Sequence, residues 1–373
     1  MKIFRTGAYE SFYDLPIKVD WILTRRCNYR CSYCFIYGKG KLAPPPMPFA
    51  TLTQLKAAVD NIASLNRPWY NVTLSGGEPT LHPHISDLVV MLHENLKERL
   101  NWLEIITNGS RNKDFYESIA DVSKLAPISL TISIHTDHVD MTHILELIEK
   151  LSRNVRIHFS LMFNPAKLEE VYLIYDILFE YRKKFPFLMN VATLRDGDRL
   201  DPRYTKEDLI WQEKAIERFK SLVNAISATV PPPKQLKRVM HIFHDIEDNG
   251  ERKIIETENR MLNFTNGLIE FNNMHCIAHA SVLRIHENGA CRGMICNADP
   301  CICNVYEENA IKAVRDKLIH AVKCPLNICG CSGNDHIPKF SSLSEAKRFM
   351  QVVADKQDAL FKDYDETYSA KTI

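Results

Sequence analysis

The sequence contains no apolar run that approaches the ~20 residues needed to cross a lipid bilayer. It also has no excess of either charge, because 47 Lys and Arg stand against 46 Asp and Glu in 373 residues. Its electrostatics therefore give no reason to expect nucleic acid or an anionic membrane surface as a partner. The first twelve residues include charged side chains and lack the apolar segment of a secretory signal. These absences predict a cytoplasmic protein with no membrane and no nucleic-acid partner.

Cysteine is absent from a stretch of more than two hundred residues and crowded on either side of it. Three of the eleven cysteines lie between Cys27 and Cys34, and the other eight lie between Cys276 and Cys331. Disulfides are rare in reducing compartments, so this clustering favours metal binding. We expect two metal-binding regions separated by a cysteine-free scaffold.

The first two-thirds of the chain alternate short apolar runs with segments of helical periodicity. Six such units predict a parallel sheet covered by helices, curled by right-handed crossovers. The predicted fold class is α/β, a partial (β/α)6 TIM-like barrel. Strands are expected at 17–23, 71–75, 103–107, 129–133, 156–162 and 188–193, and helices at 53–65, 85–96, 115–125, 141–151 and 168–181.

The last third is expected to carry a cysteine-rich hairpin and loop subdomain. A charged helix at 206–228 precedes a boundary at Pro231–Pro233, and a weak strand is expected at 253–257. Runs at 281–286 and 290–295 flank Glu287-Asn288-Gly289, which predicts a hairpin. The rest up to residue 340 is expected to be loop, before a helix at 344–360. The predicted domains are 1–228 (core), 229–273 (bridging segment), 274–340 (cysteine-rich subdomain) and 341–373 (C-terminal helix).

The first cysteine cluster has the spacing C-x3-C-x2-C, formed by Cys27, Cys31 and Cys34 on the loop after the first predicted barrel strand. Three thiolates can bind three irons of a [4Fe–4S] cluster and leave the fourth iron open for chemistry. The alternative is a zinc site. Zinc usually takes four ligands, and no histidine lies within this loop.

This loop resembles the signature of the radical S-adenosylmethionine (SAM) superfamily, C-x3-C-x-Φ-C, with Tyr33 at the aromatic position. Ser75-Gly76-Gly77-Glu78-Pro79 matches the family's GGEP segment, which the resemblance assigns to the methionyl amino group of SAM. Polar residues also follow the next three predicted strands, at the edge where ligands bind in such sheets. Each of these matches also has a purely structural alternative. A glycine pair can simply form a turn, a buried serine can simply form a hydrogen bond with the backbone, and His135 can be a hydrogen-bonded core residue. The implied cofactor-binding residues are Tyr33, Gly76, Gly77, Glu78, Pro79, Asn108, Ser133, His135 and Asn164.

The resemblance implies an enzyme that reductively cleaves SAM to a 5′-deoxyadenosyl radical, which abstracts a hydrogen from a substrate. It also implies an external electron donor of the flavodoxin or ferredoxin type. The cofactor carries this chemistry, and the protein supplies orientation and a water-poor cavity.

The second cysteine group resembles the SPASM/twitch extension, in which a hairpin bracketed by cysteines carries an auxiliary iron–sulfur cluster. Eight cysteines match the ligand demand of two [4Fe–4S] clusters, so one or two auxiliary clusters for electron transfer are expected. The spacing departs from the family run, because two C-x4-C-x-C segments stand where C-x2-C-x5-C-x3-C is usual. A zinc knuckle is the alternative, and a leftover cysteine could donate a hydrogen atom to a substrate radical. The expected ligands are Cys276, Cys291, Cys296, Cys301, Cys303, Cys324, Cys329 and Cys331.

The substrate is expected to be a peptide or protein, as in ribosomal peptide maturation, with a small molecule such as a sugar derivative as the alternative. Because the chain begins almost directly at its first predicted strand, no N-terminal peptide-recognition domain is expected, and a separate recognition protein could take that role. Arg195 and Asp196, after the sixth barrel strand, are candidate substrate contacts or a solvated loop pair. An alternative of another class is a non-catalytic iron–sulfur or zinc protein.

Overall fold

The computed structural model describes most of the chain with nine internal gaps. The described residues are 2–7, 17–34, 36–38, 47–123, 128–196, 199–226, 242–257, 271–294, 299–325 and 337–369. The predicted boundary at Pro231–Pro233 lies outside them. No helix within these residues is long and apolar enough to cross a membrane.

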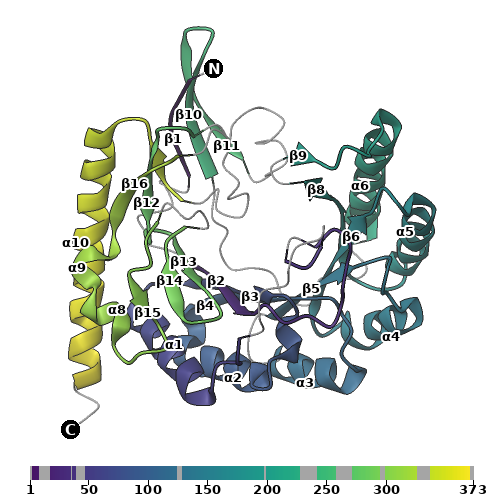
Figure 1. Cartoon of the computed structure of the whole chain (residues 1–373), viewed down its shortest axis with the longest axis horizontal. Helices are drawn as coiled ribbons and strands as arrows, with labels where there is room; N and C mark the ends of the chain where they lie inside the picture. The colour runs from purple at the N-terminus through teal and green to yellow at the C-terminus, as the bar shows by residue number, and fades with distance from the viewer. Residues whose placement is uncertain are drawn as a thin grey trace.

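A sheet of parallel strands with helices on its outer side forms the centre of the molecule (Figure 1). Each of its six strands pairs in parallel with the next along the chain, which confirms the predicted α/β fold with a partial (β/α)6 barrel. The strands are β2 (Ile17–Thr24), β3 (Tyr70–Gly76), β4 (Leu100–Thr107), β5 (Ile128–Ile134), β6 (Arg156–Phe163) and β7 (Leu188–Thr193). The helices are α1 (Leu52–Ser64), α2 (Ile85–Leu96), α3 (Lys113–Ser123), α4 (Met141–Leu151), α5 (Leu168–Arg182) and α6 (Lys206–Ile226), with the 3-10 turns η2 (Pro79–Leu81) and η3 (Lys97–Arg99).

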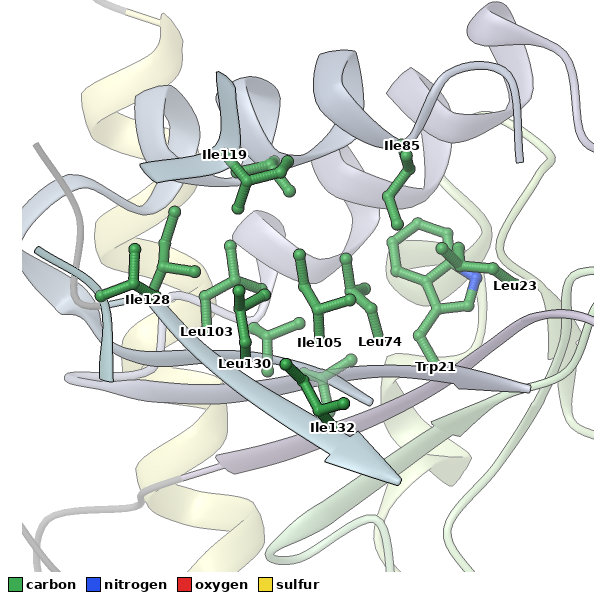
Figure 2. Packing of buried hydrophobic residues seen from close by; sticks show 14 of the residues in the cluster. Trp21, Leu23, Leu74, Ile85, Leu103, Ile105, Ile119, Ile128, Leu130 and Ile132 are labelled. Carbon is green, nitrogen blue, oxygen red and sulfur yellow. The ribbon is translucent and has the colours of Figure 1, made fainter. Parts of the chain in front are cut away.

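The outer face of the sheet is apolar because alternate residues of each strand point toward the helices. Figure 2 shows Trp21, Leu74, Ile105 and Leu130 on the side of the sheet that faces the helices, where Ile119 of α3 also lies. All five side chains are buried, and burial of each such side chain contributes about 1.5–3 kcal/mol. This packing holds the strand ends in register.

The inner face of the same sheet is polar, which is unusual for parallel strands. Thr73 of β3 and Thr131 of β5 donate hydrogen bonds to the carboxylate of Glu104 on β4, at 3.2 and 2.6 Å. On β2, Lys18 and Asp20 form an ion pair at 3.1 Å. The inner face therefore presents hydrogen-bonding groups where a closed core would present aliphatic ones.

The C-terminal hairpin extends the barrel sheet directly. β13 (Val282–Ile285) pairs in parallel with β2, and β14 (Ala290–Arg292) and β15 (Cys303–Asn304) follow it in antiparallel pairing. The predicted hairpin is confirmed. Within the described strands the sheet ends at β15 on one side and β7 on the other. A two-stranded ribbon of β8 (Arg195–Asp196) and β9 (Arg199–Leu200) follows β7.

A second sheet joins the two ends of the chain. Its strand order is β11-β10-β1-β17-β12-β16, and α10 packs on β12, β16 and β17. Figure 1 shows α10 along the side of the molecule opposite α5 and α6. The elements are β1 (Lys2–Gly7), β10 (Ile242–Asp248), β11 (Glu251–Thr257), β12 (His275–Ala278), β16 (His320–Lys323), β17 (Lys339–Phe340) and α10 (Leu343–Ser369).

Two expectations for irregular segments are wrong. The first strand of the chain is β1, which precedes the first predicted strand. Its short sequence pattern does not indicate a buried strand, and β1 becomes buried by pairing with β10 and β17. The stretch before residue 340 is also not all loop, because α8 (Ala310–Ala313), α9 (Arg315–Leu318) and three short strands lie within it. The domain boundaries stay a prediction.

Candidate active site

The loop that follows β2 carries the first cysteine cluster. Cys31 is buried, whereas Cys27 and Cys34 are half-buried, and all three are free thiols. The loop closes on itself, because Cys34 N donates to Cys31 O at 3.0 Å and Gly38 N donates to Cys34 O at 2.7 Å. The backbone N–H groups of Tyr29 and Ile36 point at the sulfurs of Cys27 and Cys34, each at 3.4 Å. Such N–H donors stabilise sulfur ligands of iron–sulfur clusters.

The three sulfur atoms are not gathered as closely as the ligands of one metal ion would be. Thiolates around one zinc lie roughly 3.8 Å apart, given Zn–S bonds of about 2.3 Å. Among the described residues, one group of three potential ligands has its atoms within 4.8 Å of one another, and it does not include Cys27, Cys31 or Cys34. Burial raises the pKa of Cys27 and, to about 12, that of Cys31, so metal binding must displace their protons. The residues fit a [4Fe–4S] cluster held at three corners.

Two neighbouring strand ends hold this loop in place. Asn28 donates to Ser110 Oγ at 2.8 Å and accepts from Asn108 Nδ2 at 2.9 Å, both in the loop after β4. The ring of Tyr29 stacks on that of His138, after β5, at 4.6 Å between centroids. The cysteine loop is thus fastened to the carboxyl ends of β4 and β5.

Tyr33 and His135 form a contact of their own in this region. Their rings stack at 5.8 Å, and Tyr33 Oη lies 2.9 Å from His135 Nδ1. Burial lowers the pKa of His135 to about 4, so its imidazole is neutral at pH 7. The structure therefore brings together two residues predicted to contact the cofactor.

The glycine pair of the GGEP segment lies against the backbone that leads into the cysteine loop. Gly76 has a φ of +146°, and a Cβ there would lie 2.1 Å from Thr24 O. A Cβ on Gly77 would lie 2.4 Å from Arg26 O. Gly77 N donates to Thr24 O at 2.7 Å, and Glu78 N donates to Arg26 O at 2.8 Å. Glycine is required here for this close approach of β3 to the loop after β2.

The carboxylate of Glu78 is fully buried and accepts hydrogen bonds from the chain itself. Oε1 accepts from Thr80 N at 3.1 Å, Thr80 Oγ1 at 2.6 Å and Thr107 Oγ1 at 2.7 Å. Oε2 accepts from Asn108 N at 2.6 Å. Burial raises the pKa of Glu78, and these donors oppose that shift. Glu78 thus joins the ends of β3 and β4, and the adjacent Pro79 is buried at the start of η2.

The remaining predicted residues divide into two sets. Ser133 lies near the end of β5, and Asn164 is buried after β6 with Nδ2 at 3.5 Å from Thr136 Oγ1. These two lie at the same edge of the sheet as Glu78 and His135. Arg195 and Asp196 lie farther along the chain, in the ribbon after β7.

The described C-terminal cysteines fall into two groups. Cys276 and Cys324 are buried in one apolar cluster, whereas Cys291 packs in the main core. Cys291 lies opposite Cys303 across β14 and β15, and Cys301 is exposed nearby in sequence. The expected ligands Cys296, Cys329 and Cys331 lie outside the described residues.

The hairpin between β13 and β14 reaches the first cysteine loop. Glu287 accepts from Arg25 N at 2.7 Å and pairs with its guanidinium at 3.4 Å. Tyr306 Oη donates to the carbonyl of Glu287 at 3.3 Å. Residues far apart in sequence therefore brace the segment just before Cys27.

Sequence reasoning missed the polar inner face and the residues that brace the strand ends. Glu104 lies on β4, and Arg156 and His158 lie on β6, with β5 between the two strands. The charge of Glu104 nevertheless acts on both of the other side chains. Their signal is the alternation of polar and apolar residues at 156–161 in β6 and the single Glu104 within the mostly apolar β4, where a parallel strand is normally apolar on both faces.

Comparison with known proteins places this geometry in a family. Residues 21–175 match the model of the Radical SAM superfamily. The solved structure described as native anSMEcpe with bound AdoMet has 12% sequence identity and a TM-score of 0.51, covering 94% of this chain and 100% of that one. Native anSMEcpe with bound AdoMet and Cp18Cys peptide has 12% sequence identity and a TM-score of 0.47, and the match covers 94% of this chain and 99% of that one. BtrN in complex with AdoMet and 2-DOIA has 13% sequence identity and a TM-score of 0.36, and the match covers 81% of this chain and 86% of that one.

The match covers β2 to α5, and therefore the cysteine loop, the GGEP segment and the strand ends around them. The likeness to anSMEcpe with AdoMet shows a shared fold over nearly the whole of both chains. With three cysteines at the superfamily spacing on the loop after the first barrel strand, residues 21–175 of this chain match a radical SAM domain.

Proposed function

We propose that this chain binds a [4Fe–4S] cluster through Cys27, Cys31 and Cys34 and uses it to cleave SAM and oxidise or rearrange a substrate. When bound, the cluster supplies the electron that splits SAM into methionine and a 5′-deoxyadenosyl radical, which abstracts a substrate hydrogen. The observation that carries the proposal is the direct fastening of the cysteine loop to the GGEP segment, through the hydrogen bonds of Gly77 and Glu78 to Thr24 and Arg26.

The chain's own residues bind and orient the cofactors in this proposal. Tyr33, His135, Ser133 and Asn164 lie around the mouth of the barrel, where the nucleoside and carboxylate of SAM would be held. His135 is neutral at pH 7 because burial lowers its pKa, so it offers a hydrogen bond without a charge. Glu78 and Asn108 keep the two strand ends at a fixed separation from the cysteine loop.

The C-terminal cysteines are proposed to hold two auxiliary [4Fe–4S] clusters. The two groups that the described residues form, Cys276 with Cys324 and Cys291 with Cys303, support two separate positions. Fully ligated clusters conduct electrons rather than bind substrate. An external flavodoxin or ferredoxin is the expected electron donor, in keeping with a cytoplasmic protein.

A peptide or protein is the proposed substrate. The barrel sheet ends at β7 and β15 without pairing of these two strands in the described structure, so the barrel is open on one side. An open barrel admits an extended chain that continues beyond the reaction centre. Recognition by a separate protein is compatible with this arrangement.

A small molecule such as a sugar derivative is the second candidate, favoured by the polar inner face. Glu104, Thr73 and Thr131 offer hydrogen-bonding groups at fixed positions, and Arg156 adds a positive charge. Groups of this kind suit the hydroxyls of a small polar ligand. The two substrate classes make different demands on these side chains.

The deciding experiment uses the full chain, reconstituted anaerobically with iron and sulfide and supplied with dithionite and SAM. We expect 5′-deoxyadenosine to form, and to form faster when a true substrate is present. A mixed peptide library and a panel of sugar derivatives are then compared as stimulants. If no 5′-deoxyadenosine forms although the clusters are intact, the chain is a non-catalytic iron–sulfur protein.

A further inference from the structure

Three ligand-type side chains from three separate segments meet in the C-terminal part of the molecule. His279 follows β12, Asp299 lies between β14 and β15, and His320 begins β16. Their ligand atoms all lie within 4.8 Å of one another. Asp299 Oδ1 is 2.9 Å from His320 Nε2, and Asp299 Oδ2 is 3.9 Å from His279 Nε2. The side chains of His279 and Asp299 are completely buried, whereas that of His320 is 25% exposed.

The hydrogen bonds of His320 fix how its ring faces the carboxylate. Its Nδ1 lies 3.2 and 3.3 Å from the carbonyl oxygens of Lys317 and Leu318, which only accept, so Nδ1 carries a proton. In the neutral ring, Nε2 is then a lone pair that faces Asp299, another acceptor. A second proton on the ring, which makes His320 an ion pair with Asp299, removes this conflict, and so does a metal ion bound by both groups. Histidines that bind metals commonly donate their other N–H to a backbone carbonyl in this way.

His279 has no hydrogen-bond partner on either ring nitrogen within the described structure, although it is only 1% exposed. A buried polar group without a partner is costly, which suggests that a ligand completes the site. The backbone of His279 is in the left-handed region at a φ of +56°, a conformation that is uncommon outside glycine.

The surrounding backbone holds this arrangement tightly. A Cβ on Gly293 would lie 2.2 Å from His279 N, so the chain after β14 can press against the His279 turn only with glycine there. Gly293 N also donates to Asp299 Oδ2 at 2.5 Å, which orients the carboxylate. The buried guanidinium of Arg67 is turned toward the carbonyls of His279 and Ala280, at 3.4 and 3.1 Å.

We propose that His279, Asp299 and His320 bind one divalent transition-metal ion, zinc, at a site that includes none of the described cysteines. Two imidazoles and one carboxylate are a zinc donor set, and tetrahedral ligands at about 2.0 Å from zinc lie roughly 3.3 Å apart. The observed separations of 2.9 and 3.9 Å lie on either side of that value. The partial exposure of His320 leaves a path for water to the fourth position. The ion would tie β12, β16 and the segment before β15 together beside the auxiliary cysteines.

The first test measures metal content. The full chain is produced anaerobically, reconstituted with iron and sulfide, equilibrated with zinc chloride, passed through a desalting column and analysed for zinc and iron by mass spectrometry. We expect about one zinc per chain. The variants His279→Gln and His320→Gln should bind zinc at least about a hundredfold more weakly. Loss of an outer-shell partner lowers metal affinity by roughly 10- to 100-fold, and loss of a direct ligand should lower it by more. The iron content of both variants should be unchanged.

His82→Gln is the matched control, because His82 is also a buried histidine with an unpartnered Nε2 and lies outside this group. It should retain the full zinc content. Equal zinc in wild type and both site variants would overturn the proposal, as would wild-type protein without zinc. A fall in iron in the two variants would make these residues cluster ligands and would also overturn it.

The second test needs no variant. X-ray absorption at the zinc edge of the wild-type protein should show nitrogen and oxygen neighbours at about 2.0–2.1 Å, with the outer-shell pattern of imidazole. Sulfur neighbours at about 2.3 Å would place the zinc on cysteines and contradict the assignment. This measurement stands even if His279→Gln or His320→Gln fails to fold.

Discussion

Oε2 of Glu78 accepts the backbone N–H of Asn108 at 2.6 Å, and the side chain of Asn108 donates to Asn28 at 2.9 Å, next to Cys27. A buried carboxylate on one strand end is therefore connected to the cysteine loop by two hydrogen bonds. A displacement of Glu78 moves Asn108, and with it the loop that carries the thiols. The GGEP segment and the cysteine signature are one structural unit.

Replacing Cys27, Cys31 and Cys34 together with alanine should abolish SAM cleavage and leave the C-terminal iron in place. The reason is that the three thiols lie on one loop after β2, whereas the other described cysteines lie in or next to β12, β14, β15 and β16. Iron and sulfide analysis with a 5′-deoxyadenosine assay measures both effects. Undiminished SAM cleavage in the triple variant would contradict the assignment of the loop.

Glu78→Gln should weaken SAM binding by roughly ten- to hundredfold, since a hydrogen bond to a charged group contributes about 1.5–3 kcal/mol. The N–H₂ group of the new amide would also face the hydroxyl groups of Thr107 and Thr80, which now donate hydrogen bonds to the carboxylate. Calorimetric titration of SAM measures the affinity. Glu104→Gln is the control, because Glu104 also accepts from threonine hydroxyls but lies mid-strand, and its SAM affinity should be that of wild type. Equal affinities in all three proteins would rule out a role for Glu78 in SAM binding.

Asn108→Ala should lower the rate of SAM cleavage by roughly 10- to 100-fold, the usual cost of losing a residue that orients a metal ligand. The change removes the contact with Asn28 but leaves the backbone bond to Glu78. Asn95→Ala, which removes a half-buried asparagine from α2, is the control and should retain the wild-type rate. A rate for Asn108→Ala equal to that of the control would mean that the cysteine loop does not need this support.

Asp245→Asn should destabilise the protein at pH 7 by about 1–3 kcal/mol, after allowance for the solvent exposure of its partners. Asp245 is buried and pairs with Arg252 and Arg5 at 2.9 Å each, and the guanidinium of Arg252 lowers its pKa most. Because the folded-state pKa is lower than the unfolded one, this stability is fully present above about pH 4 and is lost as the pH falls through the folded-state value. The difference in melting temperature between wild type and variant should therefore shrink below pH 4.

Asp87→Asn provides the control for this pH dependence, since Asp87 is 56% exposed and pairs with His84 on the surface of α2. Its melting temperature should match that of wild type at pH 7. A destabilisation by Asp245→Asn that persisted unchanged at pH 3 would show that the effect is one of packing rather than charge.

The sequence alone determined the barrel and the position of its cysteine loop. The six βα units were placed within a few residues because a buried strand between amphipathic helices has a local signature: a short apolar run, a glycine or polar stop, and a 3.6-residue period. α2 and α4 were predicted with the bounds that the structure shows. The spacing of Cys27, Cys31 and Cys34 is equally local, so the metal-binding loop could be recognised before any contact was known.

Only the tertiary structure decided which distant segments meet. β1 is stabilised by β10 and β17, which lie more than two hundred residues away, and nothing in its six residues specifies those partners. The parallel pairing of β13 with β2 likewise depends on the path of the whole chain.

The sequence likewise does not show which side chains from distant segments come into contact. Glu287 supports the loop before Cys27, and His279, Asp299 and His320 converge from segments some twenty residues apart. A single His or Asp has no periodic or spacing signal, whereas a cysteine cluster has one. Their convergence is set by strand pairing and by the close approach that Gly293 allows, and these are properties of the folded chain rather than of any local stretch of sequence.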